Sequence, residues 1–220
     1  MTDLQKFKRY LFSGFIIAAI SLVIFSKLAE DVIFNELTNF DNSIVNFVWG
    51  FRTPVLTTIM KVFTFLGSAY TVVPITLIGF YVLYRKLKHY WEANLLVITL
   101  AGGWLLNVVL KYSFHRQRPS LSSLVTATGY SFPSGHAMLG AVFYGFLAYI
   151  FYLNLRKPYR TISVALFAVL VFFIGLSRIY LGVHYPSDVI AGYMAGTFWL
   201  ASCMLALQVV RYYKSSKKNT

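Results

Sequence analysis

The most regular feature of the chain is the alternation of long apolar runs with short polar segments. Six runs have about the length that a helix needs to cross about 30 Å of hydrocarbon. Inside lipid, backbone N–H and C=O groups must find partners within the segment, and a helix provides them. The pattern therefore predicts an all-α polytopic membrane protein, a single domain over residues 1–220, with spans near residues 10–28, 68–84, 93–110, 136–154, 161–177 and 188–210.

The first apolar run follows a basic flank, Lys6, Lys8 and Arg9, as the apolar core of a signal peptide does. The residues after the run, Ser26–Ala29, make a poor small-x-small cleavage site. We therefore favour an uncleaved first span over a signal peptide.

The segment 30–66 is less regular than the rest of the chain. Residues 30–54 hold four of the seven acidic residues, and their apolar and polar positions alternate loosely, which predicts short amphipathic helices on the membrane surface. Residues 55–66 form an apolar run that Lys61 interrupts. We interpret them as a half-buried helix that leads into the second span.

Composition excludes several classes of protein. With 58% hydrophobic and 12% charged residues, the chain is not a soluble globular domain. A net charge of +13 would suggest nucleic-acid binding in a soluble protein, but here the positive charge is divided between the two sides of a membrane, so we expect no nucleic acid. The single cysteine, Cys203, excludes a disulfide within the chain, and no CxxC or HExxH pattern indicates a metal site.

The basic residues indicate how the chain is oriented. Lys and Arg accumulate in cytoplasmic loops, and an even number of spans leaves both termini on one side. Thirteen of the twenty Lys and Arg lie on the side of the termini, which predicts cytoplasmic termini. The remaining seven are Lys27, Arg52, Lys61, Lys111, Arg116, Arg118 and Arg178.

Three unusual polar stretches, residues 110–119, 131–136 and 177–188, all fall at span ends on the opposite, extracytoplasmic side. The first and third contribute Lys111, Arg118 and Arg178. Guanidinium groups bind phosphate oxygens in pairs and an ammonium adds a compact charge. The alternative for these cations is attraction to anionic headgroups without defined geometry.

The second stretch, Pro133–His136, opens the fourth span. Ser134 is a plausible N-cap, and a helix start favours an anion through its free N–H groups and its dipole. Gly135 would let the backbone approach a phosphate closely. Taken alone, Pro-Ser-Gly is also a common turn.

The third stretch ends with His184 and Asp188. Pro186 lies between them and disfavours a continuous helix, so we expect His184 in a loop and Asp188 in the first turn of the sixth span. The carboxylate would then fix one imidazole nitrogen and leave the other lone pair exposed, as in an activated nucleophile. The alternative is an acid that complements the helix dipole.

Together the three stretches resemble the signature of the PAP2 superfamily of membrane phosphatases, named after the type 2 phosphatidic acid phosphatases. That signature is K-x6-RP, then PSGH, then SR-x5-H-x3-D. Every signature position is matched, by Lys111, Arg118, Pro119, Pro133, Ser134, Gly135, His136, Ser177, Arg178, His184 and Asp188.

The resemblance implies a PAP2-type catalytic helical core and a role for each matched residue. His184 attacks phosphorus, Asp188 orients it, and His136 protonates the leaving oxygen and later activates water. The phosphoryl oxygens are held by Lys111, Arg118, Ser134, Gly135 and Arg178. No metal and no cofactor are implied.

Two residues inside the x6 segment, His115 and Arg116, match no signature position. We interpret them as contacts to lipid headgroups. On this interpretation, replacing Arg116 with Ala should cost far less activity than replacing Arg118.

The function implied is hydrolysis of a membrane lipid phosphomonoester or diphosphate at the outer leaflet. Undecaprenyl diphosphate and phosphatidylglycerophosphate are the two candidate substrates, and the outward orientation slightly favours the first. A phosphate-binding lipid transporter or scramblase is the alternative, but it would need ionisable residues within spans or paired discontinuous helices. A vanadate haloperoxidase is disfavoured because those relatives are soluble and larger. The oligomeric state is left open.

Overall fold

The computed structural model describes residues 3–119 and 123–216 of the chain. Within these ranges helices alternate with turns and loops, and no strand occurs, which confirms the predicted all-α fold class. Two of the basic residues counted near the termini, Lys217 and Lys218, lie outside the described residues. In chain order the helices are α1 (Asp3–Ile33), α2 (Thr38–Trp49), α3 (Pro54–Leu66), α4 (Ala69–Tyr81), the short π-helical segment η1 (Val82–Lys86), α5 (Tyr90–Phe114), α6 (Gly135–Asn154), α7 (Tyr159–Tyr180) and α8 (Pro186–Ser216).

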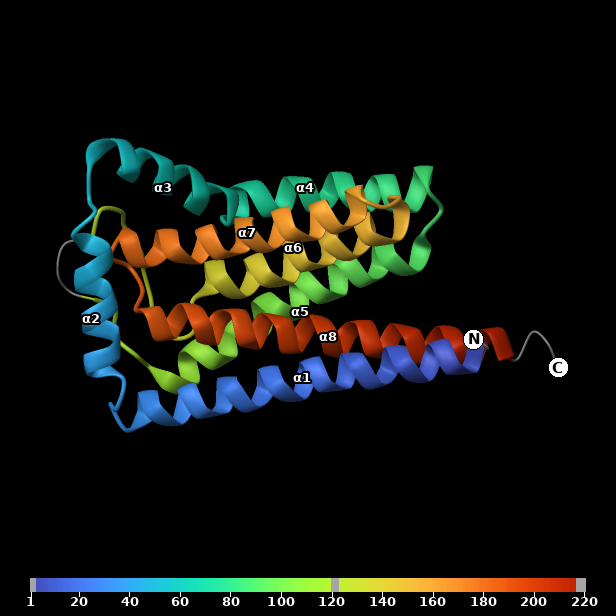
Figure 1. Cartoon of the computed structure of the whole chain (residues 1–220), viewed down its shortest axis with the longest axis horizontal. Helices are drawn as coiled ribbons and strands as arrows, with labels where there is room; N and C mark the ends of the chain where they lie inside the picture. The colour runs from blue at the N-terminus through green and yellow to red at the C-terminus, as the bar shows by residue number, and fades with distance from the viewer. Residues whose placement is uncertain (1–2, 120–122, 217–220) are drawn as a thin grey trace.

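The long helices lie side by side, and both ends of the chain are at the same end of the bundle (Figure 1). In the described part of the chain five helices are long and apolar enough to cross a membrane, namely α1, α5, α6, α7 and α8. The bent pair of α3 and α4, which continues through η1 to Lys86, passes the same test of length and composition when counted as one span, and the number of spans is then six. Five of the six predicted spans lie within one helix each.

The second predicted span covers α4 and part of η1, and α3 precedes it directly. α3 and α4 meet at Gly67 and Ser68 with a bend of 42°. Side chains satisfy carbonyl groups at this break: the Tyr144 hydroxyl donates to the Leu66 carbonyl at 2.8 Å, and the Ser68 hydroxyl donates to that of Phe65 at 2.7 Å. A broken helix is tolerated inside a membrane where such partners replace the lost backbone bonds.

The predicted surface segment contains one helix, α2, which lies across the end of the bundle opposite the termini (Figure 1). Residues 30–33 belong to α1 instead. α2 turns Asp41 and Val45 into the protein, where they are buried, and leaves Phe40 and Phe47 exposed. The segment is amphipathic as predicted, but its inner face carries a buried acid.

Two glycines bring α8 close to α6. A Cβ atom at Gly192 would lie 2.7 Å from the Ser134 carbonyl oxygen, and one at Gly196 would lie 2.5 Å from that of Met138. Small residues four positions apart are typical of membrane helices whose backbones approach this closely. The contact fixes the start of α6 against the first turns of α8, which are the two helix starts that carry signature residues.

We predict that Gly196→Ala destabilises the protein. The new methyl group meets a backbone oxygen that cannot move aside, so the two helices must separate, and overpacking of this kind costs about 1–3 kcal/mol. The measurement is the midpoint of thermal unfolding in detergent.

The matched control is Gly79→Ala on α4, where the new Cβ would lie 3.5 Å from Leu96 Cδ2, an ordinary contact. This variant should keep or raise the midpoint, because Ala favours helix over Gly by about 1 kcal/mol. Equal midpoints for both variants would contradict close packing at Gly196.

Candidate active site

The three signature stretches meet at the end of the bundle opposite the termini (Figure 1). Backbone hydrogen bonds join them. The Ser131 N–H donates to the Arg116 carbonyl at 2.8 Å, which ties the second stretch to the first. The Ser134 N–H donates to the Asp188 carbonyl at 2.9 Å, which ties the second to the third.

The centre of the site is the pair of His184 and Asp188. α7 ends at Tyr180, a tight turn follows in which Gly182 has a φ of 76°, and α8 begins at Pro186. Gly is the residue that adopts such a φ without strain. His184 therefore lies in the turn and Asp188 in the first helical turn, the arrangement that the proline predicted. The side chains are 2% and 0% exposed, and His184 Nδ1 lies 3.5 Å from Asp188 Oδ2.

Two further donors converge on the same carboxylate oxygen. The Tyr185 N–H donates to Asp188 Oδ2 at 2.8 Å, and the Ser131 hydroxyl donates to it as well. Ser131 Oγ also lies 3.4 Å from His184 Nδ1. Sequence reasoning gave Ser131 no role; its place directly before the cis Phe132–Pro133 bond offered no chemical signal.

Arg118 lies at the other edge of the imidazole, beside Nε2. Its Nη1 lies 3.0 Å from His184 Nε2 and donates to the Val183 carbonyl at 2.8 Å. Its remaining N–H groups donate to the carbonyls of Thr128 and Gly129 at 3.0 and 2.9 Å. Backbone acceptors thus hold the guanidinium over the nitrogen that does not face Asp188.

The other predicted cations reach the same region. Lys111 Nζ donates to the Tyr130 carbonyl at 2.5 Å, and Arg178 Nη1 donates to Thr64 Oγ1 at 2.5 Å. Arg178 Nε is buried, and among the described residues it has no hydrogen-bond partner. The same holds for the hydroxyl of Ser134, which is the N-cap residue of α6 but makes no side-chain cap. Two buried donor groups therefore point to an anion as ligand.

The start of α6 carries the remaining predicted residues. A Cβ at Gly135 would lie 3.0 Å from Asn107 Oδ1, so a side chain at this position would crowd Asn107. His136 is half-buried and close enough to His184 and Arg178 to interact with both electrostatically. All eight predicted site residues are thus gathered at one end of the bundle.

Burial and charge both act on His184. The pKa of the imidazole is lowered to about 4 overall: burial is the main cause, the Asp188 carboxylate opposes the shift, and the guanidinium of Arg118 adds to it. Burial also lowers the pKa of Arg118, again against the effect of Asp188. His184 is therefore neutral at ordinary pH, which leaves a lone pair on one nitrogen.

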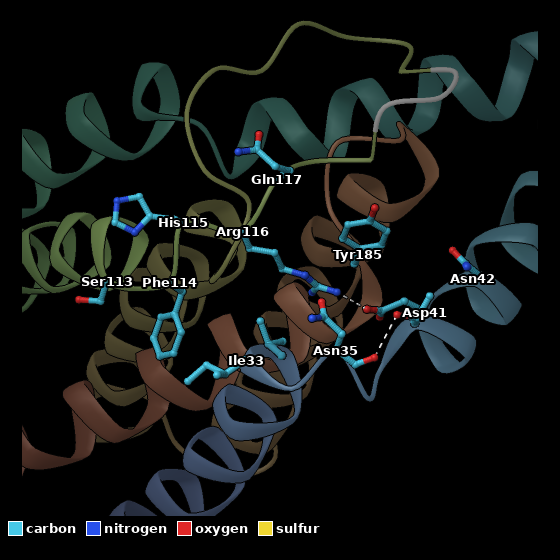
Figure 2. Close-up of a pocket in the computed structure, with 12 residues that line it drawn as sticks. Ile33, Asn35, Asp41, Asn42, Ser113, Phe114, His115, Arg116, Gln117 and Tyr185 are labelled. Carbon is cyan, nitrogen blue, oxygen red and sulfur yellow. Dashed lines mark hydrogen bonds and ion pairs between the residues drawn. The ribbon is translucent and has the colours of Figure 1, made fainter.

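Arg116 does not have the role that the sequence suggested. It was interpreted as a headgroup contact, but its Nη1 donates to Asp188 Oδ1 at 2.7 Å and its Nη2 to Asp41 Oδ2 at 2.7 Å. Burial lowers its pKa, but the two carboxylates outweigh burial and raise the pKa overall. Figure 2 shows Arg116 reaching from the segment after α5 toward Asp41 on α2. A spacing pattern confined to residues 111–188 could not reveal a partner at position 41.

A cavity of about 790 Å³ lies beside this ion pair (Figure 2). His115 lines it and packs edge-on against Tyr130, with ring centroids 4.6 Å apart. The cavity lies on the Arg116 side of Asp188, and His184 is not among its lining residues. No three His, Cys, Asp or Glu side chains of the described residues gather in a metal-binding group.

Comparisons with known proteins show the family of the chain. Residues 91–212 match the family model of the PAP2 superfamily. The chain is 34% identical to Phosphatidylglycerophosphatase B of Bacillus subtilis over 78% of this chain and 85% of that protein. It is 36% identical to an Undecaprenyl-diphosphatase of Sulfolobus acidocaldarius over 52% of this chain and 53% of that protein.

A solved structure has the same fold. The crystal structure of a transmembrane PAP2 type phosphatidylglycerolphosphate phosphatase from Bacillus subtilis matches with a TM-score of 0.78 at 30% identity. The match covers 85% of this chain and 94% of that one.

We predict that His184 titrates far below a free histidine, whose pKa is about 6.5. The fold favours the neutral imidazole, so its contribution to the free energy of unfolding is complete above pH about 6.5 and is lost as the pH falls toward 4. The measurement is NMR titration of isotope-labelled histidines in detergent, with His184→Gln to assign the signal.

Arg118→Met provides the control on the cause. Removal of this positive charge should raise the pKa of His184, because Arg118 opposes the imidazolium. A wild-type signal that titrates near 6.5, or no response to Arg118→Met, would contradict the geometry described.

Proposed function

This chain belongs to the PAP2 superfamily, and from that membership we propose that it hydrolyses a membrane lipid phosphate through a phosphohistidine at His184. The chain is a multi-pass membrane phosphatase of this type; the substrate, the residue roles and the steps are the proposal. The observation that carries it is the buried pair of His184 and Asp188 facing Arg118. A protein that only bound phosphate would need the cations. It would not need an imidazole that has a carboxylate beside one nitrogen and a guanidinium beside the other.

In the first step, His184 Nε2 attacks phosphorus. Asp188 accepts a hydrogen bond from the Nδ1–H, which stays protonated throughout, so the lone pair is on Nε2, the nitrogen beside Arg118. The nitrogen–phosphorus bond forms as the bond from phosphorus to the lipid oxygen breaks. His136 gives a proton to that oxygen, so the lipid leaves as an alcohol or as a monophosphate.

In the second step, water cleaves the phosphohistidine. His136, which is now neutral, takes a proton from the water, whose oxygen attacks phosphorus. The nitrogen–phosphorus bond breaks, the electron pair returns to His184, and inorganic phosphate is released. The same histidine serves as acid and then as base, so each turnover restores the starting protonation.

The cations neutralise the phosphoryl oxygens in both steps. Lys111 and Arg118 come from the first signature stretch and Arg178 from the third, and backbone carbonyls or Thr64 hold them in place. Ser134 Oγ and Arg178 Nε are the donors with free capacity. Preorganised charge of this kind needs no reorganisation when the transition state forms.

We propose that the termini are cytoplasmic and that the site faces the extracytoplasmic side. The support is the excess of basic residues in the loops on the terminal side. Both ends of the chain lie at one end of the bundle, and the signature stretches lie at the other (Figure 1).

For the substrate we propose phosphatidylglycerophosphate or undecaprenyl diphosphate. The relative named for the first is similar over most of both chains, and the relative named for the second over about half of each. This difference in coverage favours phosphatidylglycerophosphate, whereas orientation alone slightly favoured the lipid carrier.

The first experiment is phosphate release by the purified protein in detergent, with phosphatidylglycerophosphate, undecaprenyl diphosphate and phosphatidic acid compared. We expect release from at least one lipid. We expect His184→Ala to keep about 1% of the activity or less, because removal of a catalytic nucleophile costs a factor of the order of 10² or more.

The control is His89→Ala, at the start of α5 near the opposite end of the bundle, which should keep wild-type activity. Residual activity of His184→Ala above a few per cent would rule out the phosphohistidine. No release by the folded wild-type protein would favour the transporter alternative.

A second experiment tests for a metal requirement. We expect activity to persist in EDTA without added Mg²⁺, because side-chain cations take the place of metal ions at the phosphoryl oxygens. Loss of activity in EDTA that Mg²⁺ restores would contradict the proposed role of Lys111, Arg118 and Arg178.

A further inference from the structure

We propose that Arg116 and Asp41 are positioning residues that hold Asp188, and through it His184, in the orientation needed for attack. The inference rests on the proposed function for its effect on turnover, but not for its effect on the imidazole. No signature position covers either residue, and Asp41 lies outside the segment matched by the family model.

The first argument is how the two oxygens of Asp188 are used. Oδ2 accepts hydrogen bonds from Ser131 and the Tyr185 N–H and faces His184. Oδ1 accepts from Arg116 at 2.7 Å. An aspartate carboxylate turns easily about its last side-chain bond, because that torsion is broad. Arg116 blocks this rotation, so Oδ2 stays aimed at the imidazole.

The second argument is how Arg116 itself is fixed. Its other terminal nitrogen donates to Asp41 at 2.7 Å, and its guanidinium lies 4.4 Å from the ring centroid of Tyr185. Asp41 is 1% exposed and also accepts from the Ser187 N–H at 2.9 Å and the Ser187 hydroxyl at 2.7 Å. Asp41 thus binds both the guanidinium and the residue directly before Asp188.

The third argument is charge. A buried carboxylate without a partner is strongly unfavourable. Arg116 lies between the two acids, Asp41 and Asp188. The three charges sum to one net negative charge, not two, next to His184. The imidazole also faces Arg118, Arg178 and His136, so this single charge is set against several positive groups.

A purely structural clip between α2 and α8 is the alternative. It would lower stability when broken, but it would not change the catalytic rate of the folded protein or the titration of His184. The two explanations therefore differ in measurements that do not depend on stability.

The test compares Arg116→Gln, Arg116→Lys and Asp41→Asn with the matched control Arg211→Gln. Arg211 forms an ion pair with Glu92 of the same 2.7 Å length, but near the end of the bundle that holds the termini. Turnover is measured on the preferred lipid phosphate at 25 °C, on protein shown to be folded by its unfolding midpoint.

For Arg116→Gln we expect kcat to fall about 10- to 100-fold, with KM changed less than about threefold. A loss of this size is usual when a residue that orients a functional ligand, such as a metal-binding histidine, is removed. Arg116→Lys should recover part of the loss, because it keeps the charge but not the fork that reaches both acids. Arg211→Gln should keep kcat. Equal losses of kcat in the two glutamine variants would overturn the proposal.

Titration of His184 by NMR gives a second readout that does not need turnover. Arg116→Gln removes a positive charge and should raise the pKa of His184, whereas Asp41→Asn removes a negative charge and should lower it. A general loosening of the site would raise the pKa in both variants, because both would expose the imidazole.

The two outcomes separate this inference from the proposed function. If the wild type releases no phosphate from any lipid, the proposed function fails, while opposite shifts at His184 still support the positioning role. If the wild type is active but the His184 titration is unchanged in both variants, the proposed function stands and the positioning role is wrong.

Discussion

The carboxylate of Asp188 is fully buried at the end of a membrane helix, and the rest of the site follows from the need to compensate its charge. Desolvation of an ion costs several kcal/mol unless partners replace the lost water. Here Ser131, the Tyr185 N–H, His184 and Arg116 supply those partners from three parts of the chain. Satisfying one buried acid therefore brings the signature stretches together.

Buried polar groups also need partners in the irregular parts of the fold, which are α2 and the break between α3 and α4. α2 lies across the end of the bundle and inserts Asp41 next to the first turn of α8, so a surface helix contributes to a buried ion network. The break between α3 and α4 satisfies its carbonyls through Tyr144 and Ser68. At Gly67, a Cβ would lie 2.5 Å from Ile174 Cγ2 and 3.4 Å from His136 Cδ2, so a small residue is needed beside the site.

Positive charge at the site is held by side chains that backbone carbonyls fix in place. Backbone carbonyls from two loops fix Arg118, and the Tyr130 carbonyl fixes Lys111. A carbonyl is neutral, so it holds a cation in place and leaves its charge uncancelled. A carboxylate would cancel that charge. Arg118 and Lys111 therefore keep their attraction for a phosphoryl group, while Arg116, which is paired with two acids, lies behind Asp188.

The sequence alone predicted the fold class, five spans that each lie within one helix, and the eight candidate site residues, because apolar run length and fixed spacing are local properties of a chain. It also predicted from Pro186 that His184 lies in a loop and Asp188 in a helix start. It did not identify Arg116, Asp41 or Ser131 as partners of Asp188, and it did not predict the bend between α3 and α4. Asp41 and Asp188 are 147 positions apart in the chain, and Arg116 and Ser187 link them. No local pattern encodes such a contact, since only tertiary packing decides which charges are buried and which partner each one finds.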